Sequence, residues 1–165
     1  MAETLRAGAA ADGVDLAVWG VGGRRSPLGE AGLDRCVIGD DGLAALLASA
    51  RVHRGRLVLL VDDAEQFEDS DQAFTGLLAS RTTDLKVIAS GRSDDLRGLY
   101  SHWTRTVRKS RSGVLLQPNI DYDGELLGVT LPRRAPVALT VGRGYVVAGG
   151  NMEFLQAAGP KTPVG

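Results

Sequence analysis

Residues 56–66 read Arg-Leu-Val-Leu-Leu-Val-Asp-Asp-Ala-Glu-Gln, and the rest of the chain is organised around this stretch. Five apolar residues, Leu57 to Val61, run without a break and end at the acid pair Asp62 and Asp63. A short run rich in Val and Leu that ends in charge predicts a strand buried on both faces. Ligands of open α/β sheets bind at the carboxyl ends of the strands, where two aspartates can hold Mg²⁺ or polarise a water. The alternative is an acidic turn covered by solvent.

Composition sets the limits for this interpretation. The chain has 165 residues, which is the size of one domain, and it is 44% hydrophobic and 24% charged, as in ordinary globular proteins. Its formal net charge of −1 gives no overall attraction to nucleic acid or membranes. An acidic block over 62–71 and a basic block over 92–111 are each first interpreted as solvated faces.

Several classes of protein are not indicated. The single cysteine, Cys36, excludes an internal disulfide, and with only two histidines, His53 and His102, there is no zinc-binding cluster in the sequence. No apolar run reaches 18 residues, so no membrane span is predicted. The first residues lack a cationic start followed by a long apolar core, so they are not a secretory signal, and a cytoplasmic setting is expected.

The order of elements predicts an α/β fold. A helix is expected over 2–11, and strands are expected over 14–19, 35–38, 57–61, 85–89 and 113–116, with helices between the later ones. This alternation predicts a mostly parallel sheet with helices on both faces. Asp40 or Asp41 is the expected cap of the helix that contains Leu43, Leu46, Leu47 and Ala50, and Ser70 is the expected cap of the next helix.

The remainder of the chain changes character. Ser93 is expected to cap a helix that carries Leu96, Leu99, Tyr100 and Trp103. Apolar runs over 145–148 and 152–157, separated by Gly149 and Gly150, predict a carboxy-terminal β-hairpin. We therefore expect one domain over 1–158 and a frayed tail over 159–165.

Seven short segments then follow one another in an order that resembles a known family. They are Arg-Ser-Pro-Leu at 25–28, the acidic strand at 57–65, Val-Ile-Ala-Ser-Gly-Arg at 87–92, the basic segment and strand at 108–118, and the segments at 123–128, 131–134 and 142–145. The set is similar to the carboxy-terminal part of an FtsK/SpoIIIE-type ATPase domain, of the kind in actinobacterial type VII secretion (EccC-like) proteins. The resemblance covers roughly residues 14–158.

The resemblance implies a partial RecA-like P-loop NTPase fold that binds ATP between subunits and moves DNA or protein. By position, residues 57–63 resemble the Walker B strand, so Asp62 would hold Mg²⁺ through water and Asp63 would activate the attacking water. Many motors of this fold have Glu at the place of Asp63, so the resemblance leaves strong hydrolysis in question. Ser90 and Arg92 would sit where a polar sensor contacts the γ-phosphate. Other ATPase domains or subunits are the implied partners, and a membrane-anchored assembly could hold the chain through other segments.

One essential motif of that family does not occur. G-x-x-x-x-G-K-[ST], whose backbone amides, Lys and hydroxyl hold the phosphates and Mg²⁺, is found nowhere; the Gly-rich segment 20–26 has the wrong spacing and no Lys. ATP and Mg²⁺ are therefore expected only if another segment or chain supplies a P-loop. The resemblance places the missing strand and P-loop before residue 1, with 2–11 as the tail of the P-loop helix. We expect a portion of a translocase ATPase, inactive alone, whose unpaired sheet edges need a partner.

Two other functions stay open. The chain could be a nucleotide-free, ATPase-like module that docks on an intact ATPase, with a secreted protein as a further partner. A phosphoacceptor receiver domain fits less well, because its acidic strand should open the domain and neither Lys86 nor Lys109 ends a strand.

The basic segment also has more than one interpretation. Arg105, Arg108, Lys109 and Arg111 follow Trp103 and could contact DNA phosphates or a neighbouring subunit's nucleotide. The alternative is a solvated helix end, where cations favour the helix dipole.

Overall fold

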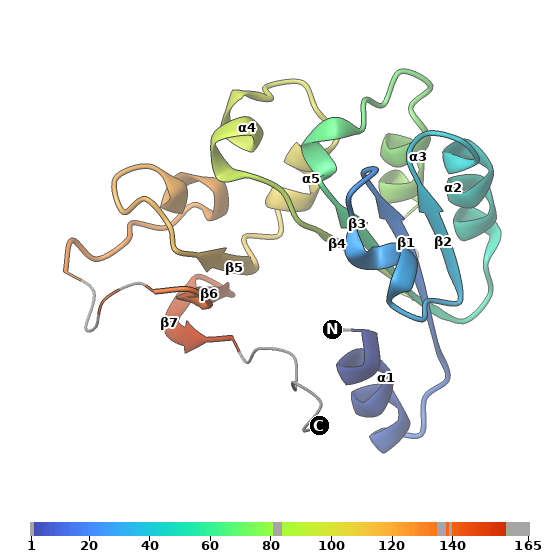
Figure 1. Cartoon of the computed structure of the whole chain (residues 1–165), viewed down its shortest axis with the longest axis horizontal. Helices are drawn as coiled ribbons and strands as arrows, with labels where there is room; N and C mark the ends of the chain where they lie inside the picture. Colours follow the sequence, from blue (N-terminus) through green and yellow to red (C-terminus); the bar gives the residue numbers. More distant parts are fainter. Residues whose placement is uncertain (1, 81–83, 135–137, 139, 158–165) are drawn as a thin grey trace. The chain divides into compact units, whose positions relative to one another are not determined.

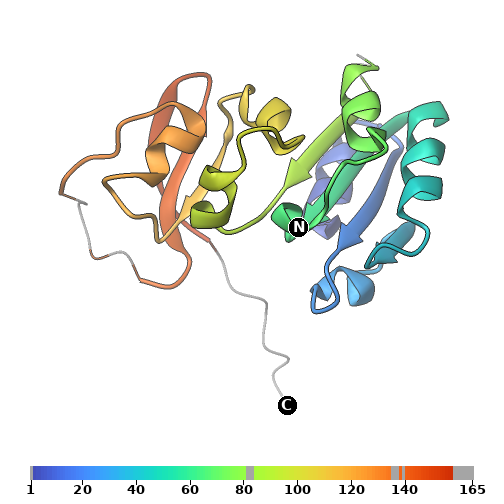
Figure 2. The same ribbon diagram turned by 90° about the horizontal axis from the view of Figure 1, so that it is seen from above.

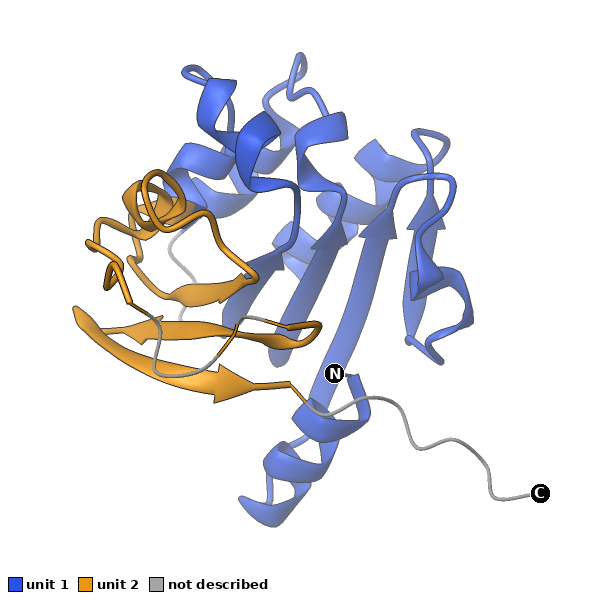
Figure 3. Ribbon diagram, turned by 60° about the vertical axis from the view of Figure 1, so that its left-hand side comes forward, with its two compact units in different colours: residues 1–107 blue, residues 108–165 orange. Residues whose placement is uncertain are grey.

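The computed structural model of the chain describes residues 2–80, 84–134, 138 and 140–157. It has two compact units, Met1–Val107 and Arg108–Gly165, which Figure 3 shows in separate colours. The single domain expected over 1–158 is thus divided between two units, and the tail expected over 159–165 lies outside the described residues.

The first unit contains a four-stranded parallel sheet. Its strands are β1 (Leu16–Gly22), β2 (Arg35–Ile38), β3 (Arg56–Asp62) and β4 (Leu85–Ala89), in the order β2-β1-β3-β4 (Figures 1 and 2). The bounds of β2 and β4 are those that the sequence predicts. β1 begins two residues later than expected and continues to Gly22, because it pairs with β3 along its full length, from Leu16 beside Arg56 to Gly22 beside Asp62.

Burial of β3 on both faces is confirmed. Leu59 and Val61 point to a large apolar cluster that includes Leu47 of helix α2 (Leu43–Val52) and Phe74 of helix α3 (Ala73–Ala79). Val58 and Leu60 point the other way, into a smaller cluster with Ala2 and Leu5 of helix α1 (Ala2–Ala11). Alternate residues of one strand thus bury opposite faces, which explains why the sequence of β3 is apolar throughout.

Short helices connect the strands. They are the 3₁₀ helices η1 (Pro27–Glu30) and η2 (Ala64–Gln66), and the α-helices α4 (Ser93–Gly98) and α5 (Thr104–Arg108). No helix within the described ranges is long and apolar enough to cross a membrane.

Two of the expected helix caps are wrong. Neither Asp40 nor Asp41 caps α2; Gly42 occupies that position with a left-handed φ of 85°, and no side chain completes the cap. Ser70 does not cap α3: Gln72 occupies the N-cap position, and the Asp69 carboxylate accepts hydrogen bonds from the N–H groups of Phe74 at 2.8 Å and Thr75 at 2.9 Å.

Helix α4 is shorter than expected and ends at Gly98, before Tyr100 and Trp103. Trp103 is instead fixed by the core, where its ring stacks on Phe74 with centroids 4.1 Å apart and its Nε1–H donates to the Phe67 carbonyl at 2.9 Å. Burial of the indole ring in the core is thus more favourable than continuation of α4 as far as Trp103.

The second unit is built on an antiparallel sheet. Its strands are β5 (Gly113–Leu116), β6 (Arg143–Ala148) and β7 (Asn151–Gln156), in the order β5-β6-β7, and the 3₁₀ helix η3 is Asp123–Leu127. The predicted hairpin is confirmed in β6 and β7. The expectation that residues 113–116 join the parallel sheet is wrong, because β5 pairs antiparallel with β6. Four apolar residues cannot specify the direction of their partner strand.

Gly144 makes the pairing of β5 with β6 possible. It lies opposite Leu116, and a Cβ at this position would overlap the Leu115 carbonyl oxygen and come within 2.8 Å of the carbonyl carbon. We predict that Gly144→Ala lowers the melting temperature, because backbone atoms cannot move aside without breaking the ladder. Gly98→Ala is the control, since a Cβ there meets nothing within 4 Å. Equal melting temperatures for the two variants in a calorimetric scan would contradict this prediction.

A polar contact joins α1 to the sheet of the first unit. The Arg6 guanidinium donates to Asp34 Oδ1 at 3.0 Å and to the Gly32 carbonyl at 2.9 Å, and the Val18 N–H donates to Asp34 Oδ2 at 2.6 Å. The Val18 N–H is the main cause that lowers the pKa of Asp34; burial raises it in part, and Arg6 lowers it further.

This contact predicts a dependence of stability on pH. Because the folded pKa of Asp34 is depressed, its contribution is present above the unfolded pKa, about 3.9, and is lost as the pH falls through the folded value. We therefore expect Asp34→Asn to remove part of the loss of stability below about pH 4. Asp15→Asn, at an exposed position, is the control. The measurement is urea unfolding between pH 2 and pH 7. If the free energy of unfolding falls below about pH 4 as much in Asp34→Asn as in the unchanged chain, the prediction is wrong.

Candidate functional site

The carboxyl ends of β1, β3 and β4 lie side by side at one edge of the parallel sheet. Gly22 is in register with Asp62, and Val61 is in register with Ala89. The residues that follow these strands are therefore brought together from three distant parts of the sequence: 23–26, 62–66 and 90–92. This is the edge at which parallel α/β sheets bind ligands.

Asp62 is held between two hydroxyl groups. Ser26 Oγ donates to Asp62 Oδ2 at 2.7 Å, and Ser90 Oγ donates to Asp62 Oδ1 at 2.7 Å. Ser90 is itself fixed, because its N–H donates to the Val61 carbonyl at 2.8 Å. Each carboxylate oxygen keeps a further acceptor site, so the arrangement leaves Asp62 able to accept a hydrogen bond from a metal-bound water.

Asp63 has an unusual backbone conformation. Its φ is 55°, in the left-handed region that residues other than glycine seldom adopt. This turn directs the side chain toward the loop after β1: a Cβ at Gly23 would lie 2.8 Å from Asp63 Oδ2 and 3.0 Å from Gln66 Oε1. The close approach of the Gly23 backbone accounts for a glycine at this position.

Glu65 is a third acid at this edge that sequence reasoning did not single out. Its Oε2 is buried and has no hydrogen-bond partner in the described part of the chain. The same oxygen lies against Gly91, where a Cβ would collide with it. A buried carboxylate oxygen without a partner is unfavourable, and such atoms are often functional.

The structure brings together four of the residues that the sequence predicts for the site: Asp62, Asp63, Ser90 and Arg92. Arg92 is exposed and directly follows Gly91, before α4 begins. The sequence did not predict Ser26 as a hydrogen-bond partner of Asp62. Its place after the Gly-rich end of β1, the strand beside β3, is the feature that could have indicated it.

The basic residues divide between the two units. Arg105 lies in the first unit, and its Nη1 donates to the Tyr100 carbonyl at 2.7 Å. Arg108, Lys109 and Arg111 lie in the second unit. Their contacts with DNA or a neighbouring subunit stay a prediction.

The acids do not form a metal cage. Across residues 2–80, 84–134, 138 and 140–157, no three His, Cys, Asp or Glu side chains come together as metal ligands. Mg²⁺ commonly keeps several waters and is held by one or two carboxylates together with substrate phosphates. Asp62 and Asp63 are a pair of carboxylates at one edge of the sheet, which is a donor set of that size.

Comparison with known proteins identifies the fold. The sequence matches no family model and no curated protein. The structure is similar to the cytoplasmic domain of EssC, with a TM-score of 0.61 and 17% identity over 85% of this chain and 33% of that chain. It is also similar to EssC (ATPases 2 and 3) from Geobacillus thermodenitrificans, with a TM-score of 0.61 and 17% identity over 85% of this chain and 30% of that one. The chain has the fold of part of these EssC chains.

The similarity to EssC confirms the fold class that the sequence resemblance implied: a partial RecA-like α/β fold with a parallel sheet, flanking helices and a carboxy-terminal hairpin. The chain spans about a third of the EssC chains that it matches.

The two hydroxyl contacts to Asp62 predict a measurable coupling. We expect Ser26→Ala and Ser90→Ala each to lower the free energy of unfolding by about 1–2 kcal/mol, because each removes a hydrogen bond to a charged group. In the double variant the losses should not add, since both side chains share one carboxylate.

The control for this cycle is Ser49→Ala, because Ser49 Oγ donates to the Ala45 carbonyl within α2 at an exposed position. Its expected effect is below about 0.5 kcal/mol. Urea unfolding of the variants measures the cycle, and strict additivity of Ser26→Ala and Ser90→Ala would argue against a shared carboxylate.

Proposed function

We propose that the chain is the metal-holding portion of a translocase-type ATPase domain, inactive until another segment or chain supplies a P-loop. The observation that carries this proposal is the Asp62 carboxylate, held by Ser26 and Ser90 at the shared carboxyl ends of three parallel strands. The EssC fold supports it, because those structures include ATPase domains.

The side chains at this edge would then have distinct tasks. Asp62 would hold Mg²⁺ through water, and Asp63 would orient the water that attacks the γ-phosphate. Ser90 and Arg92 would contact the γ-phosphate from the end of β4. The supplied P-loop would add backbone amides and a Lys for the β- and γ-phosphates, which these residues cannot replace.

The strand order indicates where a further strand could add. β4 is an outermost strand of the parallel sheet, and its alternate residues Lys86 and Ile88 are exposed. An outermost strand presents backbone N–H and C=O groups that can pair with another strand. A parallel strand beside β4 would end next to Ser90 and deliver its following loop to the Asp62 edge.

The setting follows from the same proposal. Other ATPase domains or subunits are the proposed partners, and the proposed location is the cytoplasm, with attachment to a membrane-anchored assembly through other segments. The translocated substrate would be a secreted protein, as in type VII secretion, or DNA.

A second function is a nucleotide-free module that docks on an intact ATPase. Both oxygens of Asp62 already accept hydrogen bonds within the chain, so this carboxylate is satisfied without a metal. The sequence also lacks G-x-x-x-x-G-K-[ST]. In this case the only role of Asp62 would be to hold the ends of β1, β3 and β4 together through its two hydrogen bonds.

Calorimetric titration with MgATP separates the two functions. We predict weak binding to the chain alone, and much tighter binding once it is joined to a natural segment that carries Gly-Lys-Ser/Thr. Asp62→Asn in the joined protein should weaken binding about tenfold or more when Mg²⁺ is present, because one carboxylate charge on the metal is lost. The control is Asp84→Asn, an exposed residue at the opposite edge of the sheet.

Failure of the joined protein to bind MgATP, or equal affinities for Asp62→Asn and Asp84→Asn, would support the nucleotide-free module instead.

A further inference from the structure

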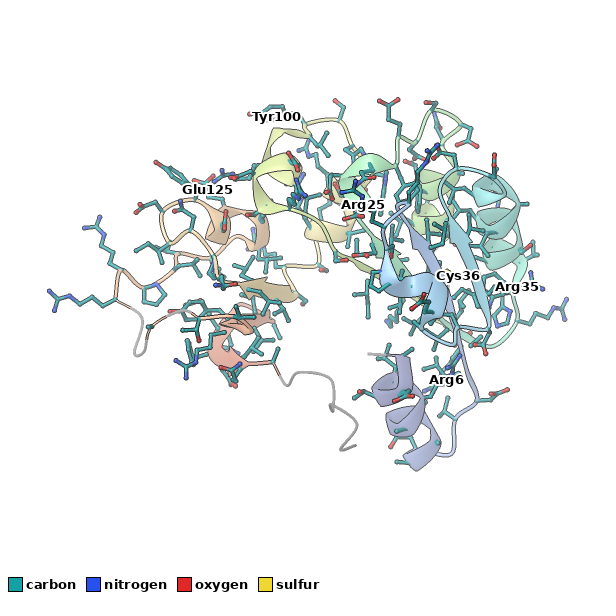
Figure 4. All side chains as sticks on the ribbon, viewed as in Figure 1. Arg6, Arg25, Arg35, Cys36, Tyr100 and Glu125 are labelled. Atoms are coloured by element: carbon teal, nitrogen blue, oxygen red, sulfur yellow. The ribbon has the colours of Figure 1, made fainter. Side chains whose placement is uncertain are left out.

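Two arginines sit at the tip of a turn that is anchored to the Asp62 edge on both sides. The Ser26 N–H donates to the Gly23 carbonyl at 2.9 Å, which closes a β-turn with Arg24 and Arg25 as its two central residues. Gly23 packs against Asp63, and Ser26 Oγ donates to Asp62. The backbone that carries both arginines is therefore fixed beside the acid pair, and Figure 4 shows Arg25 at this end of the first unit.

Both guanidinium groups are available to a ligand. Arg24 and Arg25 are exposed, and neither has a hydrogen bond or ion pair within the described part of the chain. Two other arginines of the first unit are engaged: Arg6 with Asp34, and Arg105 with the Tyr100 carbonyl. A guanidinium offers five N–H donors in a planar fork that matches phosphate oxygens.

The surrounding charge selects the kind of anion. Asp62, Asp63 and Glu65 lie at the same edge, so a bare anion would meet three carboxylates. A divalent cation at the aspartate pair would offset that charge and leave the two guanidinium groups for the anion. The ligand that satisfies both requirements carries the cation on a chain of phosphates.

We propose that Arg24 and Arg25 bind the phosphate chain of a Mg²⁺-bound polyphosphate, while the metal faces Asp62 and Asp63. This site rests on the proposed function and extends it to two residues for which the family resemblance implies no role, although Arg25 opens the segment 25–28 that resembles the family. The arginine turn would supply, from within this chain, part of the positive charge that a P-loop Lys otherwise provides.

The test uses the full 165-residue chain and inorganic tripolyphosphate with Mg²⁺, measured by calorimetric titration and by shifts of the Gly23 and Ser26 amide resonances. Arg24→Gln/Arg25→Gln should weaken binding about tenfold or more, since charge-assisted bonds to phosphate are lost. The matched control is Arg133→Gln/Arg134→Gln, an adjacent exposed pair in the second unit with the same change in charge. It should change affinity less than about twofold.

Three outcomes would overturn the site: no binding of Mg²⁺-tripolyphosphate at millimolar concentration, equal losses in the two arginine pairs, or resonance shifts confined to other residues. A DNA duplex that competes with tripolyphosphate, and whose binding falls steeply with salt, would make the turn a nucleic-acid contact and would also overturn it.

Asp62→Asn distinguishes this inference from the proposed function. Loss of binding in the arginine variant, together with unchanged Mg²⁺ dependence in Asp62→Asn, would keep the phosphate site and reject the metal-holding role of Asp62. A cooperative thermal unfolding transition of each variant, measured by circular dichroism, shows that the fold is retained.

Discussion

The Asp62 carboxylate, shared by the hydroxyls of Ser26 and Ser90, is the contact on which the rest of the site depends. It requires three parallel strands that end at the same level, because each hydroxyl comes from a different neighbour of β3. A hydrogen bond to a charged carboxylate is stronger than one between neutral groups, so this contact fixes the loops after β1 and β4 as well as Asp62 itself. The positions of Asp63, Arg92 and the arginine turn follow from those loops.

The sheet explains why β3 can present an acid pair at all. Its five apolar residues are buried on both faces, so the strand is held along its length and reaches solvent only at its two ends, Arg56 and Asp62. The edge strands differ: alternate residues of β4 are exposed, and β4 has a single neighbour in its sheet. The part of the fold that holds the acids is thus well buried, whereas β4, the strand that Ser90 follows, is open to further pairing.

Local patterns were sufficient for β2, β4 and the hairpin, because short apolar runs bounded by glycine or charge have few alternatives. They were insufficient where distant groups compete. Trp103 lies outside the helix expected for it, and its ring stacks on Phe74 in the core. The N–H groups at the start of α3 bond to Asp69 and not to Ser70. The direction of β5 depends on β6, some thirty residues later, which a four-residue run does not encode.

The site was predictable in part for the same reason. Asp62, Asp63 and Ser90 follow apolar strands, and the ends of parallel strands converge, so their proximity could be inferred from the sequence. Ser26 could not be assigned with the same argument, because its contact depends on the turn at 23–26 and on the register of β1 with β3. Glu65 follows Asp62 and Asp63 in the same motif, and the sequence pattern does not distinguish it from an ordinary solvated acid.

The central claim is that Asp62 belongs to half of a MgATP site whose other half is a P-loop. The most direct measurement is the coding sequence immediately upstream of the Met1 codon. The account predicts an apolar strand followed by a Gly-rich segment with Gly-Lys-Ser/Thr, in frame or displaced by a small frameshift, that ends close to residue 1. An upstream sequence that encodes nothing of the kind would contradict a P-loop supplied by the same gene, and the nucleotide-free interaction module would then be the better account.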